Sequence, residues 1–345
     1  MISVANSRKI KVLSFLSAFW VVQIHSCYGV GNSTFIDKAY CILALEGLYG
    51  FAVPFFFIVS GFFFMNRYDA SWRWWLNGVQ KRVVSLLFPY VFWVALFIVS
   101  TRFVFGRFDV NPLTDFGLTT VTPANGAMWY VKVLFFMCLL VPVFIPLLMF
   151  LKRHHTLTPF AFMIGAIMLG VPFPGVKTYW RAMFYFTVGI GIALGVFDFI
   201  IRQLYRFLEY RYVVIVAWII VLCIRLFHFQ LGYKCESFWL YVPLLAVPSI
   251  WIMYDWVRER CSWLKNAENS PLFMSVCELS FFVYCSHEII LRLMNHVPLI
   301  KCIDKSMVVG AVLSGCFAFI MCCILGMFLK RFLTKVYAFI TGGRG

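Results

Sequence analysis

The chain has 345 residues, of which 63% are hydrophobic, 20% are aromatic and only 13% are charged. Soluble globular domains carry about 25% charged residues, so this composition excludes an ordinary soluble domain and predicts a polytopic membrane protein. The formal net charge is +16. Because the basic residues lie in short stretches between apolar runs, membrane orientation accounts for them and no nucleic-acid partner is expected.

Ten apolar segments follow one another along the chain, and none shows the alternating pattern of a barrel strand. They are residues 12–30, 43–64, 83–104, 128–150, 158–173, 180–198, 212–230, 237–255, 272–293 and 306–329. Roughly 20 apolar residues span a bilayer as a helix. The sequence therefore predicts an all-α bundle of about ten transmembrane helices, forming one integral membrane domain over residues 1–345 with no appended soluble domain.

The distribution of Lys and Arg predicts the orientation of the bundle. Most of these residues fall on one side when the N-terminus is placed in the cytoplasm, as the positive-inside rule requires. With ten helices, both termini are then cytoplasmic. The longest connection, about residues 105–127, is expected to be an external loop.

The first segment carries a single ionisable side chain, His25, within the apolar run Val12–Tyr28. Ionisable groups in membrane segments are rare and usually face protein or water, and an imidazole titrates near neutral pH. We interpret His25 as the reactive centre. The alternative is a helix-end histidine at the headgroup level.

The second and third segments contain two further candidate features. Pro54 favours a kink, and the pair Ser60–Gly61 permits close helix packing. Lys81–Arg82 come directly before the third segment, at the start of the helix that it predicts. Two adjacent cations at a helix start are typical of the positive-inside pattern, and the alternative is a site for an anionic phosphate ligand.

Polar residues of several segments are expected at the same, outer side of the membrane. They either line one outward-facing cavity, where histidine and carboxylate suit proton transfer, or are separate interfacial anchors. Because the 12 cysteines and six histidines show no metal-ligand spacing, no metal is expected. The outer residues are His25, Glu46, Trp129, Lys132, Arg181, His287 and Glu288.

Six short stretches, in order along almost the whole chain, resemble motifs of the integral membrane acyltransferase family 3. Phe55–Phe62 resembles its FFxxSGF motif, and Val22–His25 falls where the family has its first-helix histidine. The remaining matches are Lys81–Arg82 with Leu86–Tyr90 (KR...LL.PY), Met128–Tyr130, Phe184–Gly189 and Ser280–His287.

The resemblance implies a multi-pass enzyme of the bacterial inner membrane, surrounded by membrane lipid. It would transfer an acyl group, usually acetyl, from cytoplasmic acetyl-CoA to a hydroxyl of a surface glycan or its lipid-linked precursor. The donor is expected near Lys81 and Arg82. Ser60 and Gly61 are expected as further donor contacts, although helix packing is the favoured explanation of this pair.

The resemblance also implies roles at the outer side. His25 is expected to act as general base toward the acceptor hydroxyl, and a covalent acyl-histidine relay is the alternative. His287, Glu288, Trp129 and Arg181 are expected to bind substrate.

One position departs from the family pattern. The family usually has a basic residue eleven positions before the histidine, where this chain has Ser14, and the nearest basic residue upstream is Lys11. The alternative function is a transporter or flippase of a glycan or lipid-linked sugar, against which the lack of an internal repeat argues. A third alternative is that the protein is a non-catalytic partner in an envelope complex.

Overall fold

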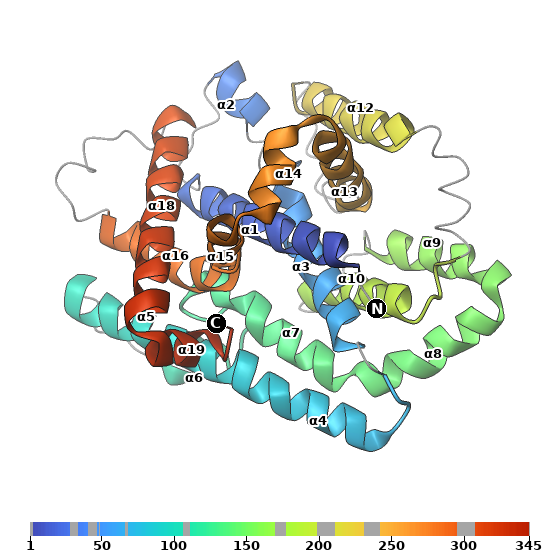
Figure 1. Ribbon diagram of the computed structural model, residues 1–345, viewed down its shortest axis with the longest axis horizontal. Coiled ribbons are helices and arrows are strands. Elements are labelled where there is room, and N and C mark those ends of the chain that lie inside the picture. The colour runs from blue at the N-terminus through green and yellow to red at the C-terminus, as the bar shows by residue number, and fades with distance from the viewer. Residues whose placement is uncertain are drawn as a thin grey trace. The chain divides into compact units, whose positions relative to one another are not determined.

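A computed structural model shows a helical protein (Figure 1). Among the residues that it describes there is no strand, so the predicted all-α class is confirmed. These residues are 3–27, 34–40, 47, 49–65, 68–105, 111–169, 177–198, 211–230, 242–294 and 308–344.

Each of the ten predicted segments contains a helix. By length and composition, however, two described helices can cross a membrane, Trp72–Phe103 and Val308–Phe332, or four if two bent pairs each count as one span. Ten spans and cytoplasmic termini therefore stay predictions. The helices are α1 (Val4–Ser26), α3 (Tyr49–Phe64), α5 (Phe88–Phe105), α7 (Trp129–Leu139), α9 (Thr158–Met168), α10 (Lys177–Ala193), α12 (Arg211–Gln230), α13 (Val242–Arg260), α16 (Ser280–Met294) and α18 (Val308–Phe332).

Two predicted segments are each divided into two helices. The helix over Gly126–Leu139 meets α8 (Val141–Arg153) at 65°, and α15 (Pro271–Cys277) meets α16 at 54°. Pro142 lies in the first turn of α8. Because proline has no N–H to continue the hydrogen-bond ladder of the preceding helix, it accounts for the first break.

Contacts divide the chain into two compact units. Unit 1 comprises Met1–Asp37, Gln80–Phe135 and Asn266–Gly345, and unit 2 comprises Lys38–Val79 and Phe136–Lys265. Each unit is built from segments that are distant in sequence.

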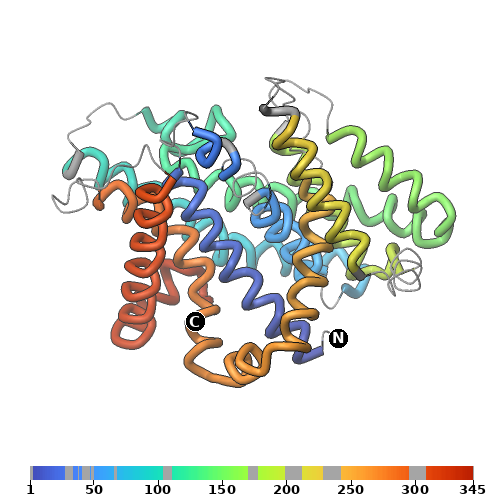
Figure 2. The backbone as a smooth tube through the Cα atoms, turned by 90° about the horizontal axis from the view of Figure 1, so that it is seen from above, coloured from blue at the N-terminus to red at the C-terminus, as the bar shows by residue number. Residues whose placement is uncertain are grey.

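In unit 1, helices α1, α16 and α18 pack against one another (Figure 2). Val22 of α1, Cys285 of α16 and Ala318 of α18 are fully buried. Gly315 of α18 permits the close approach of α1, since a Cβ there would lie 2.5 Å from the side-chain oxygen of Gln23. The packing brings the last turn of α1 against the middle of α16.

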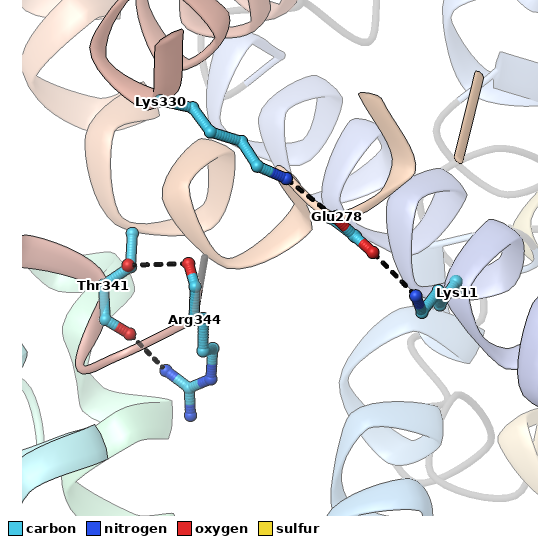
Figure 3. Close-up of polar contacts among 5 residues, drawn as sticks. All are labelled: Lys11, Glu278, Lys330, Thr341 and Arg344. Atoms are coloured by element: carbon cyan, nitrogen blue, oxygen red, sulfur yellow. Dashed lines mark hydrogen bonds and ion pairs between the residues drawn. The ribbon is translucent and has the colours of Figure 1, made fainter. Parts of the chain in front are cut away.

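An ion cluster joins the same three helices at one end (Figure 3). Glu278, at the corner between α15 and α16, accepts hydrogen bonds from the Nζ atoms of Lys11 and Lys330, each at 2.7 Å. The bend after α15 therefore places one carboxylate between two lysines.

The C-terminal helix α19 (Thr334–Thr341) packs on α5. The indole N–H of Trp93 donates to the Ile340 carbonyl at 2.9 Å, and Tyr337 is buried against Phe282. The chain then turns through Gly342, whose φ of 67° favours glycine. This turn ends beside Ser85 in η2 (Val83–Leu87), a π-helix between α4 (Trp72–Arg82) and α5.

In unit 2, α3 packs closely along α10, and α12 lies beside α13 (Figure 2). Gly61 of α3 lies against the Phe186 carbonyl, and Gly189 of α10 lies against the Ile58 carbonyl. Neither contact leaves room for a Cβ. The close packing predicted for Ser60–Gly61 is therefore confirmed, with Pro54 inside the same helix.

Candidate active site

Two histidine rings from different helices lie together in unit 1. His25 is in the last turn of α1, and His287 is in the middle of α16. Their ring centroids are 5.0 Å apart, with the ring planes inclined at 59°. His287 is fully buried and His25 is half-buried. The contact brings together the predicted general base and a predicted substrate-binding residue, separated by more than 250 positions in sequence.

The backbone of α16 defines which ring nitrogen of His287 carries the proton. Its Nδ1 lies 2.7 Å from the Tyr284 carbonyl and 3.2 Å from the Val283 carbonyl. A carbonyl oxygen only accepts, so the neutral ring carries its proton on Nδ1 and a lone pair on Nε2. Nε2 is buried and has no hydrogen-bond partner among the described residues. His287 therefore presents a hydrogen-bond acceptor in the interior, next to His25.

Glu288 attaches the short 3-10 helix η3 (Gly126–Met128) to α16. One carboxylate oxygen accepts the backbone N–H of Ala127 at 3.0 Å, and the other accepts from Arg292 at 3.2 Å. The Tyr284 hydroxyl donates to the Ala127 carbonyl. Both backbone groups of Ala127 are thus held by α16, and Glu288 and Arg292 also lie within electrostatic range of His25.

The attachment of η3 positions two side chains. Trp129 begins α7 directly after η3, half-buried, with its ring edge-on to Tyr130. Asn125 caps the start of η3 but makes no capping hydrogen bond. It is completely buried, and in the part of the chain that the structure describes neither its amide oxygen nor its nitrogen has a partner. An unsatisfied buried amide costs free energy unless a ligand or water completes it.

A second feature of unit 1 is the junction of α4 and the π-helix η2. The two cations that were predicted to bind the acyl donor lie there. Lys81 is exposed and Arg82 is half-buried at the end of α4. Single π-helical turns often occur at functional sites. Arg344 reaches the same junction by donating to the Ser85 carbonyl at 2.9 Å. Burial lowers the pKa of Arg344 to about 10, so it remains charged at neutral pH.

The other predicted site residues are not part of this cluster in unit 1. Arg181 of α10 and the pair Ser60–Gly61 of α3 belong to unit 2. Glu46 lies outside the described residues. Lys132 donates to carbonyls of Gly117 and Thr120 in the preceding connection, so its ammonium anchors that segment.

Within the described ranges, no group of three His, Cys, Asp or Glu side chains could hold a metal ion. The cluster instead offers the parts of an acid–base site: a histidine pair, a carboxylate paired with an arginine, and a buried amide without a partner. The imidazole of His25 could take up a hydroxyl proton, next to the Nε2 lone pair of His287.

Sequence reasoning named His25, His287 and Glu288, which lie together in this candidate site, but did not name three other residues described here. Asn125, Tyr284 and Arg344 carry no signal in sequence, since each depends on a partner more than 100 positions away or on the absence of one. Tyr284 lies inside the motif-like stretch Ser280–His287, which is the only hint of its part in the site.

Comparison with known proteins adds a family assignment. A protein-family model described as an acyltransferase domain matches residues 8–331 of the chain. No curated protein and no solved structure matches the chain. Because the matched region extends over nearly all of the sequence and contains the histidine pair, the chain belongs to acyltransferase family 3.

Proposed function

We propose that this membrane acyltransferase transfers an acetyl group from acetyl-CoA to a hydroxyl of a surface glycan or its lipid-linked precursor. The observation that carries the proposal is the contact between His25 and His287 at 5.0 Å. It places a titratable base beside a buried acceptor lone pair, in a family whose members transfer acyl groups. The proposed location is the bacterial inner membrane.

In the proposed reaction, His25 takes the proton of the acceptor hydroxyl while the hydroxyl oxygen attacks the thioester carbonyl carbon. The C–O bond forms, the C–S bond breaks, and the thiolate of CoA leaves and takes up a proton. His287 accepts a hydrogen bond at Nε2 from the acceptor hydroxyl or from protonated His25. A positioned general base of this kind contributes about 10²–10⁴-fold to the rate.

The supporting groups have distinct proposed tasks. Trp129, held by η3, provides an aromatic face for a sugar ring, and Asn125 provides an amide donor for its hydroxyls or for the developing oxyanion. Glu288 holds η3 in place and balances the charge of Arg292. Arg181 of unit 2 stays a proposed substrate contact.

The acyl donor is proposed to bind at Lys81 and Arg82, whose two charges suit a phosphorylated ligand. Ser60 and Gly61 stay proposed donor contacts. The position of Gly61 against the Phe186 carbonyl already explains that glycine through packing.

The first test is glycan O-acetylation in a deletion strain carrying the wild type or His25→Ala, with membrane levels of each protein measured. His154→Ala is the matched control, because His154 lies in an exposed turn after α8. O-acetyl groups restored by the wild type and the control but not by His25→Ala support the proposal. Full restoration by His25→Ala overturns the mechanism.

A second measurement separates an enzyme from a transporter. Purified wild-type protein should release free CoA from acetyl-CoA when acceptor is present. Movement of a lipid-linked sugar across the membrane without consumption of thioester would contradict the enzyme and identify a transporter.

A further inference from the structure

The connection over residues 111–124, between α5 and α7, is folded onto itself (Figure 1). The Leu118 N–H returns to the Leu113 carbonyl at 2.6 Å, and the Ala124 N–H donates to the Asp115 carbonyl at 2.7 Å. These hydrogen bonds close a compact Ω-loop, which leads into η3. The loop belongs to unit 1, as does the histidine pair.

The side chain of Lys132 enters this loop from α7. Its Nζ donates to the carbonyls of Gly117 and Thr120. Gly117 has a φ of 64°, and a Cβ there would lie only 3.2 Å from Nζ, so glycine at this position leaves room for the ammonium. The loop is therefore built around a positive charge.

That charge has no anionic partner in the part of the chain that the structure describes. Both of its hydrogen-bond partners are neutral carbonyls, and an ammonium has three N–H donors, so one N–H remains. Two acids of this region are engaged elsewhere: Asp115 accepts the Asn111 N–H at 2.8 Å, and Glu288 pairs with Arg292 at 3.2 Å. Because the Lys132 side chain is only half-buried, a ligand can reach it.

A second open donor lies on the same stretch of chain. Asn125 is completely buried, and its amide has no partner among the described residues. The Pro123 nitrogen, two residues earlier, would lie 3.3 Å from the same Gly117 Cβ that approaches Lys132 Nζ. The loop therefore brings the ammonium close to the chain that leads to Asn125.

The helix η3 connects these two donors to the histidine pair. A Cβ at Gly126, the first residue of η3, would lie 3.7 Å from the Glu288 carboxylate. Glu288 directly follows His287 on α16. The open donors and the histidine pair therefore adjoin the same short helix.

We propose that Lys132 binds an anionic oxygen group of the acceptor, a carboxylate or a phosphate, while Asn125 donates to a hydroxyl of the same sugar. A lysine ammonium attracts either group as a point charge. The acceptor is then an acidic sugar, whose charge comes from a sugar acid of the glycan or from the phosphate of a lipid-linked precursor. This inference rests on the proposed function and names the chemical class of its acceptor.

The test compares three acceptors that share a glucose-type ring and an octyl chain: octyl glucoside, octyl glucuronide and glucosyl octyl phosphate. Binding of each radiolabelled compound, and acetyl transfer to it, are measured with the purified full-length protein in phosphatidylcholine nanodiscs. The wild type should bind at least one anionic compound about tenfold or more tightly than neutral octyl glucoside. Tighter binding of the glucuronide identifies a sugar acid, and tighter binding of the phosphate identifies the lipid-linked precursor.

Substitutions separate recognition of the charge from anchoring of the loop. Lys132→Gln should weaken binding of the preferred anionic compound about tenfold and leave octyl glucoside unaffected, because glutamine retains an N–H donor for the loop carbonyls but has no charge. Lys132→Arg should restore part of the affinity. Asn125→Ala should weaken binding of all three compounds, since each carries sugar hydroxyls. Lys335→Gln, which removes an exposed charge from α19, should bind like the wild type.

The inference is overturned if the wild type binds neither anionic compound more tightly than octyl glucoside, or if Lys132→Gln binds the anionic compounds like the wild type. An equal loss for neutral and anionic compounds in Lys132→Gln overturns it in favour of a role in anchoring the loop. In these cases, acetyl transfer by the wild type leaves the proposed function standing. Preferential binding of an anionic compound without release of CoA from acetyl-CoA would instead support the anion site and contradict the proposed function.

Discussion

His287 is held in one tautomer by its own helix, because two backbone carbonyls of α16 surround Nδ1. In the neutral ring, a histidine whose Nδ1–H is engaged in this way offers a lone pair at Nε2. Its neighbour His25 is at the end of α1 and half-buried, where protons can be exchanged with substrate or solvent. The two rings are therefore suited to different tasks, with His25 exchanging the proton and His287 accepting a hydrogen bond.

Substitutions of His287 should separate the contributions of its two nitrogens. Asn places an amide near the position of Nδ1 and preserves the donation to Tyr284, whereas Gln places an acceptor near Nε2. If the Nε2 lone pair is what matters, His287→Asn should lower the transfer rate about 10²-fold or more, and His287→Gln should retain more activity. Rates are measured at saturating acetyl-CoA, and the KM for the donor should not change.

If His287→Asn is instead more active than His287→Gln, the hydrogen bond from Nδ1 to the backbone of α16 is the one that transfer requires. His154→Asn serves as the control for loss of an imidazole elsewhere. Thermal unfolding of each variant in detergent shows whether the fold is retained.

At the scale of elements, helix contacts in both units depend on glycine. In unit 1, Gly315 faces Gln23, and in unit 2, Gly61 and Gly189 face backbone carbonyls across the α3–α10 contact. Small residues at helix contacts are typical of membrane proteins, since lipid provides no hydrophobic drive for association. Helix packing therefore explains the pair Ser60–Gly61 without a role in donor binding.

Gly61→Ala should destabilise the protein, because the new Cβ would collide with the Phe186 carbonyl, which cannot move without displacing α10. Overpacking of this kind costs about 1–3 kcal/mol. Gly50→Ala is the matched control on the same helix, since its Cβ would make an ordinary contact of 3.8 Å with Pro243. Thermal unfolding in detergent measures the difference, and equal stability of the two variants would contradict the packing role.

The ion cluster of Lys11, Glu278 and Lys330 is relevant to Ser14, the position at which the chain departs from the family pattern. Lys11 is the nearest basic residue before the histidine, yet its ammonium pairs with Glu278, next to Lys330. Lys11 is therefore engaged at the corner of α15 and α16, and the described contacts give it no link to His25.

Lys11→Gln should leave acyl transfer within a few-fold of the wild type. Its stability should fall by less than about 1 kcal/mol, since partly exposed ion pairs contribute little. Both effects are measured in the O-acetylation and thermal unfolding assays, with Lys335→Gln as a control for loss of charge. A loss of activity as large as that of His25→Ala would show that Lys11 substitutes for the missing basic residue.

Much of this organisation can be predicted from sequence, and the rest depends on long-range contacts. Apolar runs predict where helices lie, and His25 is distinctive because it is the one ionisable group in its run. The breaks after Leu139 and Cys277 were not predicted, although Pro142 signals the first. The unpaired amide of Asn125 could not be predicted, because its lack of partners among the described residues is a property of the folded chain.

At the scale of the whole molecule, the predicted orientation would make the proposed reaction vectorial. Lys and Arg gather on the side assigned to the cytoplasm, and the net charge of +16 fits attraction to an anionic cytoplasmic leaflet. In unit 1, α16 carries both Phe281, which lies under the Arg344 guanidinium, and His287 of the histidine pair. The donor is then expected to enter from the cytoplasm and the acceptor to be modified toward the outer face.

Sealed membrane vesicles test this sidedness. Inside-out vesicles should consume acetyl-CoA added to the bulk solution, because their cytoplasmic face is exposed. Right-side-out vesicles should consume it only after permeabilisation by detergent, since a charged CoA thioester does not cross a bilayer. Vesicles containing His25→Ala report background hydrolysis. Consumption by intact right-side-out vesicles, with none by intact inside-out vesicles, would place Lys81 and Arg82 on the outer face. It would reverse the predicted topology while leaving the geometry of the histidine pair intact.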